Sequence, residues 1–285
     1  MSEIMLCGGD LRQISAANVL ADKGYNVCFF KNARTPFLSD RVRICTEPEF
    51  ENAGIVILPL PCSSDDIHLN CEFSDKPLLE EIFSCLCDRN KVYGGKLTPY
   101  IKGLADRSGV LVTDILEDEG FSIKNAYLTA EGAISVALQQ SRVGLSGLNC
   151  LVIGYGRIGK CLAYLLRQMG AKVTVSARKD SDLAWIENYG YTPVQTKDVV
   201  ENTHEFDIVF NTVPVRMIKA ESLSHKSLYI ELASTPYGVN PEEVMNSGKQ
   251  FLLAASLPGK ISPVAAGKII AQTVLNLENR RGDEG

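Results

Sequence analysis

The sequence predicts an α/β protein built from two open, mostly parallel sheets with flanking helices, one in each half of the chain. Short apolar runs alternate with segments of helical spacing throughout both halves, which is typical of repeated strand–helix–strand units. Most of these runs end in glycine, proline or polar residues, as strands do where they leave a sheet. At 285 residues the chain is long enough for two domains, each with its own core.

A glycine-rich loop in the second half gives the clearest signal. The apolar run 150–153 leads into a G-x-G-x-x-G pattern, which is followed by a helical pattern ending at Gly170 and a second apolar run at 171–175. A Rossmann dinucleotide-binding domain requires this strand–loop–helix–strand context, because its glycines serve the tight turn, the approach to a pyrophosphate and close helix–strand packing. The alternative is a turn that binds no ligand. We predict that a dinucleotide binds at Gly154, Tyr155, Gly156, Arg157, Ile158 and Gly159.

The residues after the next strand indicate which dinucleotide binds. NAD-binding domains place an acid about 20 positions after the first glycine, where it binds the ribose 2′-hydroxyl. Here Ser176, Ala177, Arg178 and Lys179 occupy that place, and the first acid is Asp180. A hydroxyl, a guanidinium and an ammonium suit a 2′-phosphate, so we predict NADP in preference to NAD. The alternative is a basic surface turn.

Later strands of the second half end in loops that we expect to line the same crevice. Ligands of open α/β sheets bind beyond the carboxyl ends of the strands. The last strand is followed by a loop, 257–260, whose Lys260 could face the crevice and act in catalysis; otherwise Lys260 is a solvated loop lysine. The further predicted cofactor-binding residues are Asn211, Thr212, Val213, Pro214, Ala233 and Ser234.

The first half predicts a flavodoxin-like or Rossmann-like domain. One helix should begin at Pro77, and another at Pro99 with Thr98 as its cap, because proline is favoured at the first position of a helix. Strands are expected at 4–7, 25–30, 54–58, 91–93 and 110–114.

The order of these elements predicts the domain boundaries. We expect a substrate domain over 1–128 and a dinucleotide-binding Rossmann domain over 129–264, which begins with a connecting helix near 129–142. The acidic stretch 117–120 before that helix has the composition of a turn. The final helix, 265–285, is amphipathic and could pack back onto the first domain.

Two charged residues follow the first strand and its glycines, Gly8 and Gly9. In one interpretation Arg12 binds a carboxylate of a small substrate with help from the two glycine amides, so that Asp10 and Arg12 belong to the catalytic site. In the other, Asp10 only caps the helix that follows. The residues alone leave both interpretations open.

Composition argues against several classes of protein. The net charge of −5 gives no basic surface for nucleic acid, and no apolar run reaches the roughly 18 residues that span a membrane. The start of the chain lacks the basic segment of a secretory signal, so we expect a cytoplasmic protein. The nine cysteines lack metal-site spacing, which predicts reduced thiols and no bound metal. None of the three histidines ends a strand, so no histidine acid–base group is visible.

Six motifs together resemble the A subunit of dipicolinate synthase. Their order and spacing run from near the N-terminus to the last helix, at 8–13, 129–133, 154–159, 176–179, 210–214 and 257–260. The resemblance implies oxidation of dihydrodipicolinate, or of its hydrated precursor, to pyridine-2,6-dicarboxylate, together with a flavoprotein-like second subunit. It also implies the mother-cell cytoplasm of a spore-forming bacterium and the two-domain architecture of formate and glycerate dehydrogenases.

Other functions stay open at this point. A 2-hydroxyacid or shikimate-type dehydrogenase would share the dinucleotide domain but needs a base facing the nicotinamide. A non-catalytic nucleotide-sensing module would bind nucleotide without converting a substrate. Oxidation of a dihydropyridine has less need of a strong base, because aromatisation favours it, so orientation and carboxylate binding could suffice. The sequence also allows a homo-oligomer.

Overall fold

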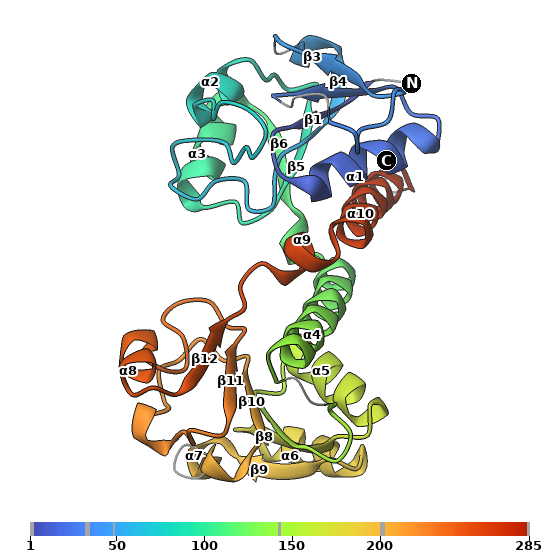
Figure 1. Cartoon of the computed structure of the whole chain (residues 1–285). Coiled ribbons are helices and arrows are strands. Elements are labelled where there is room, and N and C mark those ends of the chain that lie inside the picture. The colour runs from blue at the N-terminus through green and yellow to red at the C-terminus, as the bar shows by residue number, and fades with distance from the viewer. Residues whose placement is uncertain (1–2, 32–34, 48, 142–143, 200–202, 284–285) are drawn as a thin grey trace. The chain divides into compact units, whose positions relative to one another are not determined.

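The computed structural model describes the whole chain except residues 1–2, 32–34, 48, 142–143, 200–202 and 284–285. The described residues form two compact units, one of residues 1–125 with 262–285 and the other of residues 126–261. Each unit contains a six-stranded sheet with helices packed against it, and every pairing between neighbouring strands is parallel (Figure 1). The two parallel sheets confirm the predicted fold class.

Unit 1 has the strand order β3-β2-β1-β4-β5-β6. The central strand β1 is buried along its whole length, because apolar clusters cover both faces of the sheet. The strands are β1 (Glu3–Cys7), β2 (Val27–Phe30), β3 (Arg43–Cys45), β4 (Ala53–Ile57), β5 (Lys91–Gly94) and β6 (Leu111–Asp114). The helices are α1 (Leu11–Asp22), α2 (Leu79–Ser84), α3 (Pro99–Ser108) and α10 (Pro263–Asp283), with short 3₁₀ turns η1 (Phe50–Asn52) and η2 (Ile115–Glu117).

Unit 2 has the strand order β12-β11-β10-β7-β8-β9. Its strands are β7 (Asn149–Ile153), β8 (Lys172–Ala177), β9 (Thr192–Gln195), β10 (Ile208–Asn211), β11 (Leu228–Glu231) and β12 (Gln250–Leu253). Its helices are α5 (Arg157–Gln168), α6 (Asp180–Asn188), α7 (Thr196–Val199), α8 (Pro241–Asn246) and α9 (Leu257–Ile261), with 3₁₀ turns η3 (Thr203–Glu205) and η4 (Ala220–Ser222). The long helix α4 (Glu119–Ser141) contains the division between the units.

Helix α10 joins unit 1 by lying against α1 (Figure 1). Gly267 makes this close approach feasible, because an added Cβ would lie 2.5 Å from Ser15 Cβ and would also overlap the Arg12 carbonyl oxygen. Farther along α10, Glu278 accepts a hydrogen bond from Lys91 Nζ at 2.8 Å and one from the Tyr93 hydroxyl. The helix is therefore attached both to α1 and to the sheet.

Three predicted boundaries were wrong. The connecting helix starts at Glu119 rather than near 129, because an Asp118 carboxylate oxygen accepts a hydrogen bond from the Phe121 amide at 2.7 Å. The acidic stretch therefore forms the cap and first turn of α4, where carboxylates are favourable. Helix α2 starts at Leu79 rather than Pro77, because Leu78 is extended and pairs with His68. Residues 257–260 belong to α9 rather than to a loop.

The predicted cap of α3 was confirmed. The Thr98 side chain caps α3, with Pro99 in the first turn. All nine cysteines are free thiols, and most of them are buried. No helix in the described part of the chain is long and apolar enough to cross a membrane.

We predict opposite effects of the same substitution at two helical glycines of unit 1. Gly267→Ala should destabilise the protein by about 1–3 kcal/mol, since overpacking forces α1 and α10 apart. Gly103→Ala, the matched control, should stabilise it by about 0.5–1 kcal/mol, because the added Cβ meets only the end of the Arg107 side chain, at 4.0 Å. Urea unfolding of both variants measures the two changes, and equal shifts would contradict this packing.

Candidate functional site

A cavity of about 430 Å³ lies at the carboxyl edge of the unit 2 sheet. Its walls come from the loops after β7, β8 and β10 and from the residue that follows β9. In an open parallel sheet this edge, beside the central strand, is where ligands bind. The lining residues are Gly154, Tyr155, Gly156, Ala177, Arg178, Lys179, Asp182, Thr196, Thr212, Val213, Pro214, Val215 and Met217.

Two glycines of the loop after β7 are required by the protein itself. Gly154 has φ +97°, and an added Cβ would lie 2.6 Å from both Thr212 Oγ1 and Val213 Cγ2. At Gly159, in the first turn of α5, an added Cβ would overlap the Gly154 carbonyl oxygen. These two residues therefore bring the end of β7 and the start of α5 into close contact, whether or not a ligand is bound.

Gly156 is different, because nothing in the protein explains the absence of its side chain. Its φ of −79° suits any residue, and an added Cβ meets no atom within 4 Å. Gly156 is also the N-cap of α5 and provides no side-chain cap. The open space therefore lies at the positive end of a helix dipole, where backbone amides favour an anion. A pyrophosphate group would fit there.

The structure brings together only part of the predicted cofactor-binding set. Ser176 is fully buried, and its hydroxyl receives hydrogen bonds from the Gly154 amide and Thr196 Oγ1, each at 3.4 Å. Its side chain therefore does not reach the cavity, contrary to the expectation that it binds a phosphate. Arg157, Ile158, Gly159, Asn211, Ala233 and Ser234 are also absent from the described residues that line the cavity.

Four lining residues were not predicted from the sequence, namely Asp182, Thr196, Val215 and Met217. Thr196 directly follows β9, so the rule that ligands lie beyond strand ends could have found it. Asp182 lies in the first turn of α6 and shares the wall with Arg178 and Lys179. This wall therefore combines two cationic side chains with one carboxylate.

A buried polar network supports another wall of the cavity. Asn211 Nδ2 donates to Val213 O at 2.9 Å, and Asn211 Oδ1 accepts from the Val213 amide at 3.2 Å. The same Nδ2 donates to Glu231 Oε1 at 2.7 Å. Glu231 also accepts from the amides of Ala233 and Gly238, at 3.0 and 2.8 Å. Asn211 and Ala233 thus act from behind the wall instead of lining it.

Glu231 is fully buried, and its hydrogen-bond partners among the described residues include no cation. Burial is the main cause that raises the pKa of this carboxyl, against the opposite effect of the hydrogen bonds it accepts. The network therefore holds the loop after β10 in one conformation at some electrostatic cost.

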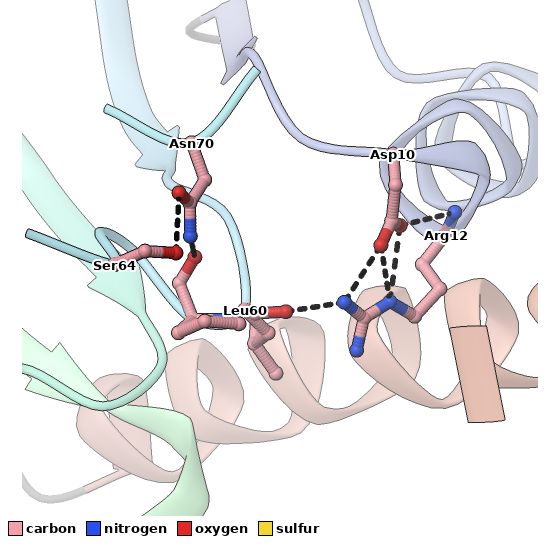
Figure 2. A network of polar contacts seen from close by, with 6 residues as sticks. Asp10, Arg12, Leu60, Ser64 and Asn70 are labelled. Atoms are coloured by element: carbon pink, nitrogen blue, oxygen red, sulfur yellow. Dashed lines mark hydrogen bonds and ion pairs between the residues drawn. The ribbon is translucent and has the colours of Figure 1, made fainter. Parts of the chain in front are cut away.

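A second polar site lies after β1 in unit 1 (Figure 2). Asp10 caps α1 by accepting a hydrogen bond from the Arg12 amide at 2.9 Å, and its pairing with the Arg12 side chain leaves the substrate interpretation open. Arg12 Nε lies 3.0 Å from both Asp10 carboxylate oxygens, and Arg12 Nη2 lies 2.7 Å from Oδ2 and also donates to the Leu60 carbonyl. Among the described residues, Arg12 Nη1 has no hydrogen-bond partner.

The glycine amides beside this pair were expected to assist an anion, and that expectation was wrong. The Gly8 amide donates to Phe30 O at 2.9 Å, and the Gly9 amide donates to Asn70 O at 2.7 Å. Asn70 also links the neighbouring loop, because its side chain donates to Pro61 O and accepts from Ser64 Oγ, both at 2.9 Å (Figure 2). Both amides are therefore used within the protein.

Lys260, the third predicted catalytic residue, lies on α9 in unit 2 with its side chain exposed. His68, expected to have a local role, pairs through Nδ1 with Asp65 Oδ2 at 2.8 Å on the surface. No group of three or more His, Cys, Asp or Glu side chains in the described ranges is placed to hold a metal ion.

The fold and the cavity define a class: an oxidoreductase-like protein with a domain for a nicotinamide dinucleotide. Residues 124–229 match the family of D-isomer specific 2-hydroxyacid dehydrogenase NAD-binding domains. Residues 3–116 match the N-terminal domain of the dipicolinate synthase A subunit. These two matches cover different parts of the chain, and the match of residues 3–116 shows its similarity to the dipicolinate synthase A-subunit family.

Relatives of that family extend the match along the chain. The dipicolinate synthase A subunit of Bacillus subtilis strain 168 is 27% identical over 284 residues, covering 96% of this chain and 95% of the relative. The crystal structure of the A subunit from Bacillus halodurans superposes with a TM-score of 0.88 at 25% identity, covering 97% of each chain. That of the Bacillus subtilis protein gives a TM-score of 0.87 at 26% identity, covering 100% of this chain and 98% of that one.

We predict that Gly156→Val abolishes dinucleotide binding while the protein stays folded. The branched side chain would extend into the open space at the start of α5, where an added Cβ meets no protein atom within 4 Å. Calorimetric titration with NADP measures the loss of affinity, and circular dichroism tests folding. Gly159→Ala is the contrasting variant, since its methyl group overlaps the Gly154 carbonyl and should destabilise unit 2. Normal dinucleotide binding by Gly156→Val would show that the pyrophosphate does not occupy this space.

We also predict a pH signature for Glu231. Because its pKa is raised in the folded protein, the native state binds the proton more tightly than the unfolded chain. The resulting stabilisation is complete below the unfolded pKa, about 4.3, and is lost as the pH rises through the folded pKa. The free energy of unfolding should therefore fall across that window more steeply in the natural protein than in Glu231→Gln. Urea unfolding at a series of pH values measures both slopes, and parallel curves would contradict the prediction.

Proposed function

We propose that this chain is the NADP-dependent subunit of an oxidoreductase that converts dihydrodipicolinate, or its hydrated precursor, to pyridine-2,6-dicarboxylate. The observation that carries the proposal is the open space at Gly156 in a chain similar to the dipicolinate synthase A subunit along its length. The name of those relatives supports a second subunit, which we infer to be flavoprotein-like. We infer the mother-cell cytoplasm of a spore-forming bacterium as the location.

In this proposal the loop after β7 holds the dinucleotide. The amides at the start of α5 would bind the pyrophosphate, while Arg178 and Lys179 would bind the 2′-phosphate. When bound, the nicotinamide supplies the hydride acceptor of the reaction. The Asn211 and Glu231 network would keep the wall at 212–214 in place, so little reorganisation is needed on binding.

For the substrate, the proposal requires binding of its carboxylates more than it requires a strong base. Loss of a hydride and a proton from a dihydropyridine ring gives an aromatic ring, which makes the step favourable. Arg12 would bind one carboxylate through Nη1, with Asp10 fixing the guanidinium. The third residue that we propose for catalysis is Lys260, whose side chain is exposed on α9 of unit 2.

One alternative keeps a specific observation in its favour. The match of residues 124–229 is to the NAD-binding domain of 2-hydroxyacid dehydrogenases, so a 2-hydroxy acid could be the substrate. Against it, the described histidines do not lie in the cavity wall. Activity on a hydroxy acid would favour this alternative.

The experiment supplies dihydrodipicolinate and NADP to the full chain, with and without the second subunit. Reduced nicotinamide and pyridine-2,6-dicarboxylate are followed together, and a set of 2-hydroxy acids serves as the comparison. The proposal expects both products to appear in equal amounts with dihydrodipicolinate only. Turnover of a hydroxy acid instead, or binding of nucleotide with no turnover in any mixture, would reject it.

We predict that the dinucleotide preference depends on the charges after β8. Arg178→Ala should weaken NADP binding by about tenfold to a hundredfold and leave NAD nearly unchanged, because one charge-assisted hydrogen bond is lost. Asp182→Asn should strengthen NADP binding, since a carboxylate in the same wall repels a phosphate. Lys172→Ala, at the other end of β8, is the control. Equal affinities of the unmodified protein for NAD and NADP at low salt would refute this interpretation of the wall.

For Arg12→Ala, we predict weaker substrate capture by about 2–4 kcal/mol, with nucleotide affinity unchanged. The expected value reflects loss of a partly buried, charge-assisted contact. Steady-state kinetics and calorimetry measure the two quantities. Arg41→Ala is the matched control, because Arg41 is an exposed partner of Asp22 in the same unit. An equal loss of both affinities would make Arg12 a structural residue.

A further inference from the structure

Unit 2 has a second cavity, whose aromatic lining is not explained by the nucleotide site. It measures about 310 Å³, and five of its six lining residues are aromatic. They come from the loop after β7, from α5 and from α6 with the turn that follows it. The lining residues are Tyr155, Lys160, Tyr164, Trp185, Tyr189 and Tyr191.

The aromatic wall of this cavity is partly exposed, and two of its rings stack on each other. Trp185 and Tyr189 stack with ring centroids 5.5 Å apart and an interplanar angle of 21°. Trp185 and Tyr189 are each 55% exposed, and Tyr164 is 51% exposed, although rings of this size are usually covered. A planar ligand could therefore stack on the outer face of this pair without any rearrangement of the core.

The turn after α6 is built to hold this wall in position. The Arg167 guanidinium donates to the Tyr189 carbonyl oxygen and lies over the Tyr191 ring, 5.6 Å from its centroid. Gly190 has φ +75°, and an added Cβ would lie 2.5 Å from Arg167 Nη1. Arg167 and Gly190 thus fix the two tyrosines on either side of the turn.

The charge of the cavity selects the class of ligand. Lys160 is the one charged side chain among its described lining residues, and its ammonium lies 5.2 Å from the centroid of the Tyr155 ring. An aromatic cage without a charge would suit a cationic ligand, but here a lysine already occupies the face of one ring and would repel a second cation. An anionic group, by contrast, would gain a charge-assisted hydrogen bond.

Tyrosine hydroxyls add donors at the same place. Burial raises the pKa of Tyr155 to about 12 and also raises the pKa of Tyr191, so both hydroxyls keep their protons near neutral pH. A carboxylate accepts hydrogen bonds from such groups, whereas its ring would stack on the indole and phenol faces. The cavity volume matches a single small ring system with its substituents.

We infer that this cavity is a second ligand site, which takes a planar aromatic carboxylate stacked on Trp185 and Tyr189 and paired with Lys160. Tyr155 lines both this cavity and the nucleotide cavity, so a ligand here contacts a wall of the other site. The aromatic dicarboxylate that we propose as the reaction product belongs to this class. That link to the product rests on the proposed function, but the site itself does not.

Trp185 is the only tryptophan of the chain, so its fluorescence reports on this cavity directly. The full chain is titrated with pyridine-2,6-dicarboxylate and with benzoate, with excitation at the red edge of the indole absorption. Both should give a saturable change in emission. Tetramethylammonium, a cation of the kind that aromatic cages bind, should give none. The measurement requires no turnover, so its result is separate from that of the activity assay.

Variants decide whether the signal belongs to this site. Lys160→Gln should weaken binding of both aromatic acids by about tenfold or more, because a charge-assisted bond is lost, and Tyr189→Leu should weaken it through loss of stacking. Lys172→Gln, an exposed lysine elsewhere in unit 2, should bind as the unmodified chain does. Unchanged affinity in Lys160→Gln would overturn the inference. So would an emission change produced by the second subunit but by neither aromatic acid, which would make the surface a protein interface.

Discussion

The close contact between β7 and α5 is the constraint on which the nucleotide site depends. A methyl group at Gly159 would overlap the Gly154 carbonyl oxygen, so the start of the helix lies directly against the end of the strand. Gly154, in a left-handed conformation beneath Thr212 and Val213, turns the chain sharply enough to permit this. The remaining glycine of the loop then faces open space at the positive end of α5.

In the corresponding loop of unit 1, the glycine amides are used within the protein. There Gly8 and Gly9 also follow a central strand and precede a helix, but their amides bond to Phe30 and Asn70. Asp10 occupies the cap of α1, with Arg12 paired to it. The amides of Gly8 and Gly9 are therefore not available to a pyrophosphate. Two sheets of the same type therefore carry different sites, and the difference lies in a few residues after the central strand.

How much of the fold and of the site the sequence could predict depends on whether the signal is local or arises from contacts between distant residues. Apolar runs and glycine spacing are local, so the loop at 154–159 and most strands were predicted, but the edge strands β3 and β9 were missed. The start of α4 was missed because Asp118 and Glu119 suit both a turn and the first turn of a helix. Ser176 was misplaced because β8 continues to Ala177, and alternation along the strand then turns the serine inward. The position of Asp182 at the cavity depends on tertiary contacts, and so do the long-range hydrogen bonds of Glu231. Thr196 was missed because the strand before it, β9, was not predicted.

Hydrogen exchange of the full chain with and without NADP tests the central claim most directly. If the dinucleotide binds at the open start of α5, bound NADP should slow exchange of backbone amides in peptides that cover 154–160, 177–182 and 212–217. The amides of Gly8 and Gly9, which are already hydrogen-bonded, should show no change. Protection around 8–13 without protection around 154–160 would contradict the assignment of the nucleotide to unit 2.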